Sequence, residues 1–181
     1  MTKIPTITKK KTQSPFISAQ VKQGTMTNLR PYRFYKNPQE AIKGKKVFLT
    51  GHTGFKGTWL TLLLENLNLP IIGLSLDPQE DSLYTRLNRK KKISEEYIDI
   101  RDLEGVGDFL RRYRPSAIIH MAAQPLVLES YRKPRDTFEV NVMGTHTVLE
   151  SAFELDCVKA VLVVTTDKVY RNDNSGEMFI E

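Results

Sequence analysis

The feature that most constrains the fold is a set of three glycines, Gly51, Gly54 and Gly57, directly after an apolar segment that ends at Thr50. An apolar strand that runs through a glycine-rich turn into a leucine-rich helix is typical of dinucleotide-binding folds. Gly51 permits a tight turn, Gly54 lets the backbone approach a pyrophosphate, and Gly57 lets the helix pack against the sheet. The helix N-terminus favours an anion. The pattern predicts a pyrophosphate site, and a purely steric glycine turn is the alternative.

The spacing of the glycines separates this turn from two other nucleotide sites. It is Gly-x-x-Gly-x-x-Gly, not the Gly-x-Gly-x-x-Gly of the commonest dehydrogenases. No Gly-Lys-Ser/Thr follows the turn, which disfavours the P-loop of nucleotide triphosphatases.

Apolar segments alternate with helical patterns through the rest of the chain. Strands are predicted at 47–51, 71–75, 96–100, 117–120 and 160–165, and helices at 58–68, 102–113 and 137–155. Asp102 is the predicted N-cap of the second helix, and the continuously apolar last strand is of the type buried on both faces. This order predicts an α/β fold, a doubly wound parallel sheet (Rossmann fold) of about five strands with its ligands at the carboxyl ends of the strands.

The basic residues are concentrated at the start of the chain. The formal net charge is +6, but residues 1–38 contain eight Lys and Arg and no Asp or Glu, so residues 39–181 carry about −2. We therefore expect a basic, disordered extension over 1–38, a cofactor domain over 39–181, and no nucleic-acid groove. A transit peptide, a basic arm for an acidic partner and a true start at Met26 remain open for the extension.

The remaining composition indicates a cytoplasmic protein. The N-terminal segment has no apolar stretch long enough for a signal peptide or a membrane span. Cys157 is the only cysteine, which fits a reducing compartment, and it is interpreted as a structural thiol. No metal site is predicted.

Three sequence blocks together resemble one known family. They are residues 50–59 (TGHTGFKGTW), residues 120–127 (HMAAQPLV) with Asn141–Gly144, and residues 163–168 (VVTTDK). They are similar to the extended short-chain dehydrogenase/reductase family of NAD-dependent epimerases and dehydratases, and within it to the nucleotide-sugar 4,6-dehydratases. The resemblance covers about residues 42–181. It implies NAD as the cofactor and a nucleotide sugar, CDP-glucose, as the substrate.

The resemblance also assigns cofactor contacts. Asp99 would accept a hydrogen bond from the adenine amino group, although it could merely cap a turn. His52 would lie beside the pyrophosphate, or else be a surface imidazole. Where a ribose-binding carboxylate is expected the chain has Ser75, with Asp77 two residues on, which leaves NAD versus NADP open. The full cofactor set is Gly51, His52, Gly54, Phe55, Lys56, Gly57, Ser75, Asp77, Asp99, Ile100, Ala122, Ala123 and Gln124.

Three consecutive residues are assigned to the chemistry. The resemblance implies that Thr166, Asp167 and Lys168 face the sugar, where hydride leaves carbon 4, water is eliminated across carbons 5 and 6, and the hydride returns to carbon 6. Asp167 would be the general acid, which requires a raised pKa. Lys168 would act either as a base or as an electrostatic group on the enolate. A plain polar turn is the alternative.

The family also uses a Tyr-x-x-x-Lys pair to deprotonate the sugar hydroxyl. No lysine lies four residues after any of the tyrosines that we considered, namely Tyr84, Tyr97, Tyr113, Tyr131 and Tyr170. We therefore expect the pair to be missing, the chain to be the N-terminal portion of an enzyme, and the 181 residues alone to show no turnover. Another epimerase or reductase of the family and a non-catalytic NAD-binding remnant are the alternatives. Relatives often form homodimers. Asn141 is interpreted as a structural amide.

Overall fold

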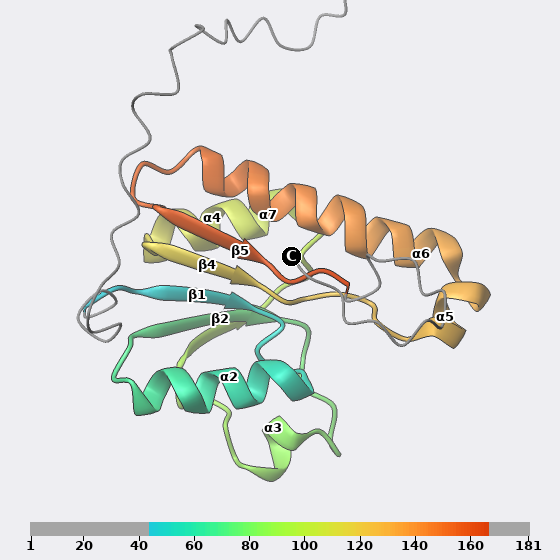
Figure 1. Ribbon diagram of the computed structural model, residues 1–181, viewed down its shortest axis with the longest axis horizontal. Coiled ribbons are helices and arrows are strands. Elements are labelled where there is room, and N and C mark those ends of the chain that lie inside the picture. The colour runs from blue at the N-terminus through green and yellow to red at the C-terminus, as the bar shows by residue number, and fades with distance from the viewer. Residues whose placement is uncertain (1–43, 167–181) are drawn as a thin grey trace, which may run out of the picture. The chain divides into compact units, whose positions relative to one another are not determined.

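The computed structural model describes residues 44–166, which form one parallel sheet covered by helices (Figure 1). The strands occur in the order β3-β2-β1-β4-β5, so the order reverses between β1 and β4. Ligands bind at such a reversal in doubly wound folds. The predicted Rossmann fold is confirmed. The strands are β1 Val47–Thr50, β2 Ile71–Ser75, β3 Ser94–Tyr97, β4 Ala117–His120 and β5 Ala160–Val163.

The helices cover both faces of the sheet. Figure 1 shows α2 on one face and α4 with α7 on the other, and α4 packs against α7. This arrangement follows from helical crossovers between parallel strands. The helices are α2 Phe55–Asn66, α3 Leu83–Arg86, α4 Leu103–Tyr113, α5 Val127–Arg132, α6 Pro134–Phe138, the π-helix η2 Glu139–Met143 and α7 Gly144–Phe153.

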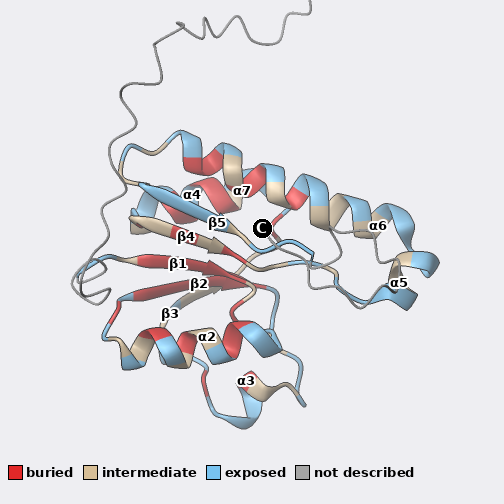
Figure 2. Ribbon diagram, in the orientation of Figure 1, coloured by how far each residue is buried: buried red, intermediate tan, exposed pale blue. Residues whose placement is uncertain are grey.

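Alternate side chains of β1 build two separate cores. Phe48 points into a cluster with α4 and α7, which includes Phe109 and Val148. Val47 and Leu49 point to the other face, into a cluster with Leu64 of α2 and with residues 69 and 71. Because both faces of the central strands are covered, every residue of β1 and β2 is buried (Figure 2).

The structure confirms the predicted start of α4 and shifts other boundaries. Asp102 caps α4, because its Oδ1 accepts a hydrogen bond of 3.0 Å from the N–H of Gly105. The third strand is β3, which pairs over Ser94–Tyr97, so Asp99 lies beyond its end. The helix predicted over 137–155 begins earlier, at Pro134, and contains the π-helix η2.

The prediction of a buried last strand is wrong. Leu162 is 58% exposed, and Val161 and Val164 are exposed as well. β5 is the last strand in the sheet order, and within residues 44–166 no strand pairs with its outer edge. A continuous apolar run predicts burial on both faces only where neighbouring elements cover both.

Candidate functional site

The turn between β1 and α2 is packed so tightly that two of its glycines have no room for a side chain. Gly51 has a φ of +73°, in the left-handed region that favours glycine. A Cβ on Gly51 would lie 2.9 Å from the backbone nitrogen of Ala122. A Cβ on Gly57 would overlap the carbonyl oxygen of Gly51 and lie 2.8 Å from the Cα of His52. The glycine turn, the start of α2 and the loop after β4 therefore meet, as the sequence predicts.

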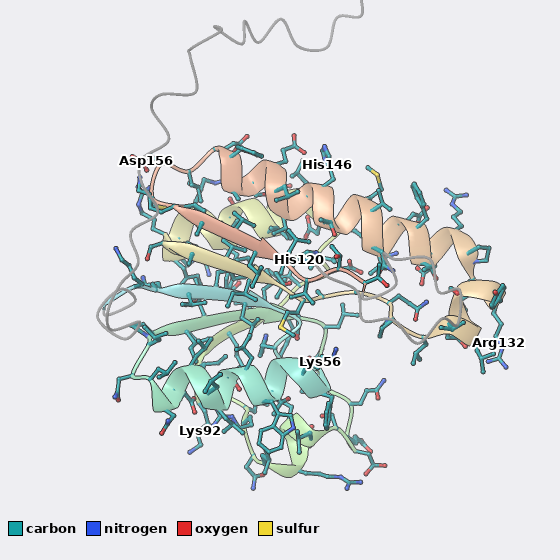
Figure 3. All side chains as sticks on the ribbon, viewed as in Figure 1. Lys56, Lys92, His120, Arg132, His146 and Asp156 are labelled. Carbon is teal, nitrogen blue, oxygen red and sulfur yellow. The ribbon has the colours of Figure 1, made fainter. Side chains whose placement is uncertain are left out.

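The N-terminus of α2 has the properties of an anion site. Its N-cap is Gly54, no side chain caps it, and its first turn contains no acidic residue. Phe55 and Lys56 of that turn are exposed. Figure 3 shows Lys56 at the same end of the sheet as His120, the last residue of β4. Free N–H groups and a positive side chain at one helix end favour a phosphate there.

The loop after β4 is tied to the end of β1 by Thr50. The Oγ1 of Thr50 accepts hydrogen bonds from the backbone N–H groups of Met121, at 3.0 Å, and Ala122, at 3.1 Å. Thr50 also lies opposite His120 in the register of β1 and β4. Thr50 was not among the functional residues predicted from the sequence. The available signal was a polar residue at the carboxyl end of each of two adjacent central strands.

Asn141 of the π-helix η2 holds the other end of this loop. Its Oδ1 accepts from the backbone N–H of Gln124 at 2.8 Å, and its Nδ2 donates to the carbonyl of Gln124 at 3.1 Å. The geometry agrees with its interpretation as a structural amide. Gln124 itself donates to Thr137 and accepts from the N–H of Leu126. Its side-chain amide therefore makes hydrogen bonds within the loop.

His52 lies inside the protein, and the surface alternative is wrong. Its side chain is 0% exposed, and its Nε2 lies 2.9 Å from the Oε2 of Glu95 on β3. A Cβ on Gly73 of β2 would lie 2.6 Å from the His52 ring. The ring therefore packs against β2. That the backbone of His52 lies beside the pyrophosphate stays a prediction. Burial lowers the pKa of His52, although Glu95 acts in the opposite direction.

Glu95 is the centre of a cluster of side chains that was not predicted from the sequence. It accepts hydrogen bonds from the N–H of Lys91 at 2.6 Å and from the hydroxyl of Tyr84 at 2.5 Å, besides that of His52. Burial raises the pKa of Glu95, but these hydrogen bonds together outweigh burial and the net shift is downward. Burial together with Glu95 and Asp77 raises the pKa of Tyr97 to about 12. The cluster joins the glycine turn to β3.

Asp99 lies past the end of β3 with its carboxylate held by Arg101. The guanidinium of Arg101 donates to both carboxylate oxygens, at 2.6 Å to Oδ2 and 3.0 Å to Oδ1, and its N–H donates to Oδ1. Arg101 thereby lowers the pKa of Asp99. Asp99 thus caps the turn, as the alternative interpretation states. A contact with adenine would have to use the same carboxylate oxygens that Arg101 already holds. The side chain of Ile100 is in the core, which leaves its backbone for a cofactor.

The end of β2 presents a buried hydroxyl and an exposed carboxylate. Ser75 is 4% exposed, and its Oγ lies 2.7 Å from the Oγ1 of Thr53 in the glycine turn. Asp77 is exposed beyond it. The structure therefore brings Asp77, and not Ser75, to the surface where a ribose carboxylate is expected.

The residues assigned to catalysis lie at the limit of the described chain. Thr166 is exposed past β5, whereas Asp167 and Lys168 lie outside the described residues. The expectation that the chain lacks a Tyr-x-x-x-Lys spacing needs correction, because Tyr32 and Lys36 have it. They precede β1 and also lie outside the described residues. The resemblance places the family pair after the fifth strand, so this spacing does not match it.

Two other kinds of site receive no support from the described part of the chain. No group of three or more His, Cys, Asp or Glu side chains among residues 44–166 could hold a metal ion. Over the same residues, every helix is too short or too polar to cross a membrane.

Comparisons with known proteins agree with this geometry. A family model described as GDP-mannose 4,6 dehydratase matches residues 48–177. CDP-glucose 4,6-dehydratase of Salmonella typhimurium is 44% identical over 132 residues, which are 72% of this chain and 36% of that protein. dTDP-glucose 4,6-dehydratase of Escherichia coli is 28% identical over 59% of this chain and 30% of its own length. The chain thus spans about a third of these relatives.

A solved structure gives the same answer for the fold. UDP-glucose 4-epimerase of Thermus thermophilus, in complex with NAD, is 31% identical and matches with a TM-score of 0.55. The match covers 64% of this chain and 36% of the epimerase.

Proposed function

Since this chain belongs to the GDP-mannose 4,6-dehydratase family, we propose that it carries the NAD-binding site of a nucleotide-sugar 4,6-dehydratase that acts on CDP-glucose. The observation that carries the proposal is the glycine turn, where Gly51 and Gly57 leave no room for a Cβ and α2 begins without a side-chain cap. The 44% identity to a CDP-glucose 4,6-dehydratase supports the substrate.

The described residues fit a dinucleotide at this edge of the sheet. Gly54, Phe55 and Lys56 would hold the pyrophosphate at the N-terminus of α2. Asp77 would bind the adenosine ribose, and Asp99 the adenine. Ala122 and Ala123 would line the cofactor past β4. Bound NAD would supply a hydride acceptor and donor for the sugar.

The chemistry on the sugar is assigned to the residues after β5. Asp167 would protonate the departing hydroxyl at carbon 6, which requires an environment that raises its pKa. Lys168 would either remove the proton from carbon 5 or stabilise the enolate by its charge. Thr166 would contact the sugar beside them.

We further propose that residues 39–181 form the cofactor domain, that residues 1–38 are a basic extension, and that the protein is a cytoplasmic homodimer. The charge difference between the two segments supports the boundary. Light scattering of the purified protein tests the dimer, since a single monomeric mass would exclude it.

An epimerase is the second candidate, because a UDP-glucose 4-epimerase is 31% identical in the same fold. An epimerase inverts carbon 4 and keeps the oxygen at carbon 6. The two functions therefore differ in product mass, since only the dehydratase releases water.

We expect NAD to stabilise the protein against unfolding. A ligand at 100 times its Kd adds about 2.7 kcal/mol to the free energy of unfolding, and thermal denaturation with increasing NAD measures this effect. NADP should stabilise less, because Asp77 would repel its 2′-phosphate. Asp77→Asn should reduce the difference between the stabilisation by NAD and that by NADP. An unchanged midpoint with both dinucleotides would refute the cofactor site.

If natively expressed protein carries the family's Tyr-x-x-x-Lys pair beyond these 181 residues, we expect it, supplied with NAD, to convert CDP-glucose to a 4-keto-6-deoxy sugar. The 181 residues alone should show no turnover. Mass spectrometry detects the loss of one water, and UDP-glucose, dTDP-glucose and GDP-mannose serve as competing substrates. Asp167→Asn should lower kcat at least about 100-fold, because general acid catalysis typically contributes that much. Formation of a 4-epimer without loss of water would favour the second candidate.

A further inference from the structure

A series of hydrogen bonds in the interior runs from the end of β1 through His120 to α7. The Nδ1 of His120 lies 2.7 Å from the Oγ1 of Thr50, and its Nε2 lies 3.0 Å from the Oγ1 of Thr145. Thr145 in turn donates to the carbonyl of Asn141 at 2.7 Å. His120 is 2% exposed. Figure 3 shows it in the interior, beneath α7. These hydrogen bonds therefore connect β1, β4, η2 and α7.

The donor and the acceptor of each of these hydrogen bonds follow from counting the available protons and lone pairs. The Oγ1 of Thr50 already accepts from the N–H groups of Met121 and Ala122, so its own proton must point to the Nδ1 of His120. That nitrogen is consequently an acceptor, and the proton of the imidazole is on Nε2. The Nε2–H donates to Thr145, whose hydroxyl proton is used on Asn141. His120 is thus neutral, in one fixed tautomer.

A charged imidazole does not fit this arrangement. With a proton on Nδ1, three N–H groups would point at the Oγ1 of Thr50, and the hydroxyl proton of Thr50 would lose its acceptor. Relief requires the loop at Met121 and Ala122 to move away from Thr50. That movement changes the contact between Ala122 and Gly51, where a Cβ would already lie 2.9 Å from the Ala122 nitrogen.

We propose that His120 is a positioning residue for the NAD site, and that its neutral form holds the loop of Met121–Gln124 against the glycine turn while protonation releases the loop. The proposal rests on the proposed function of that turn. Thr50 holds the first half of the loop and Asn141 holds the second. His120 joins these two anchors, because Thr145 connects it to the carbonyl of Asn141.

Among the groups on the elements around His120, its own imidazole is the one whose protonation would release the loop. Burial lowers the pKa of His120. β1 and β5 contain no titratable residue, and β4 contains none besides His120. On α7, His146 pairs with Glu150 at 3.4 Å, and on η2, Glu139 pairs with Arg135. These pairs are on exposed side chains.

The test separates the two nitrogens of His120 with two variants that do not titrate. Asn in His120→Asn places an amide oxygen near the position of Nδ1 and keeps the acceptor for Thr50. Gln in His120→Gln places an amide nitrogen near Nε2 and keeps only the donor to Thr145. His146→Asn, on the exposed face of α7, is the matched control.

The first readout is the Kd for NAD between pH 7.5 and pH 5. The wild-type protein and His146→Asn should bind NAD about tenfold more weakly at pH 5, because protonation of His120 releases the loop. His120→Asn should lose this pH dependence, because its amide does not titrate over this range. His120→Gln should bind about tenfold more weakly throughout. The same pH dependence in His120→Asn and wild type would overturn the proposal.

The second readout needs no cofactor. Hydrogen exchange of the Met121 and Ala122 amides in the free protein, corrected for intrinsic rates, should accelerate at pH 5 in the wild type and not in His120→Asn. Equal protection in the two proteins would overturn the role of His120. Absence of NAD binding in every protein, with this exchange pattern intact, would instead overturn the proposed function of the turn and retain the link between His120 and the loop.

Discussion

Gly57→Ala should destabilise the protein more than any other single methyl group added in the glycine turn. The new Cβ would overlap the carbonyl oxygen of Gly51 and lie 2.8 Å from the Cα of His52 and 2.9 Å from the carbonyl carbon of Gly51. All three are backbone atoms, so no side-chain rotation relieves the overlap. We expect a loss of about 3 kcal/mol, at the upper end for overpacking. Urea unfolding measures the loss, and NAD binding should disappear with it.

Gly54→Ala is the matched control, because it adds the same methyl group three residues earlier. Gly54 has a φ of −70° and a ψ of 169°, which alanine adopts without strain. Its Cβ would meet only the Gly51 oxygen, at 3.3 Å. The free energy of unfolding should therefore change by less than about 1 kcal/mol. NAD affinity should still fall, because the methyl group would occupy the approach of the pyrophosphate. Equal unfolding of both variants would contradict the steric argument.

The sheet was predictable because the residues of its central strands have the apolar composition of strands buried on both faces. Residues 47–50 and 71–75 are apolar or small, are buried on both faces and pair as expected. Asp102 was predictable for a different reason, since helix capping is a local interaction between a side chain and an amide three residues on. Local chemistry and continuous burial are both visible in one sequence.

Properties that depend on distant partners were not predictable in this way. The residues of β5 are as apolar as those of a buried strand, but the exposure of β5 depends on which elements lie beside it. His52 follows Gly51 directly, yet its ring is buried because Glu95, 43 residues later, accepts its hydrogen bond. Asp99 was predicted inside a strand over 96–100 but lies past the end of β3, and the hydrogen bonds from Arg101 to its carboxylate depend on side-chain geometry.

Glu95→Ala should destabilise the protein by about 3 kcal/mol. The Glu95 carboxylate accepts hydrogen bonds from His52, Tyr84 and the backbone N–H of Lys91. Its removal leaves the Nε2–H of His52 buried without an acceptor, which costs about 1–3 kcal/mol. It also leaves the Tyr84 hydroxyl only the carbonyl of Arg89, at 3.3 Å. Because His52 belongs to the glycine turn, NAD affinity should fall as well. Chemical denaturation and NAD titration measure the two effects.

Glu96→Ala is the control on the same strand. Glu96 pairs with Arg112 at 2.6 Å, but the Arg112 side chain is 62% exposed, and exposed ion pairs contribute about 0–1 kcal/mol. This variant should remain close to the wild type in stability and in NAD affinity. A loss as large as that of Glu95→Ala would mean that the effect arises from β3 in general and not from the buried cluster.

The pH dependence of stability distinguishes the Glu95 cluster from a simple loss of packing. Burial lowers the pKa of His52 below its ordinary value of 6.5, so the unfolded chain takes up the proton first and wild-type stability falls as the pH drops below 6.5. The pKa of Glu95 is lowered from 4.5, so its contribution is present above pH 4.5 and is lost as the pH falls through its folded pKa.

The two variants should therefore differ in the shape of their stability curves. Without Glu95, only the backbone hydrogen bond at Leu74 opposes the effect of burial on the His52 pKa. The decline that begins below pH 6.5 should therefore continue to lower pH than in the wild type. The further loss below pH 4.5 that Glu95 supplies should be missing. Glu96→Ala should follow the wild-type curve. A Glu95→Ala curve that is merely displaced downward, parallel to the wild type, would show that the carboxylate stabilises the turn by packing alone.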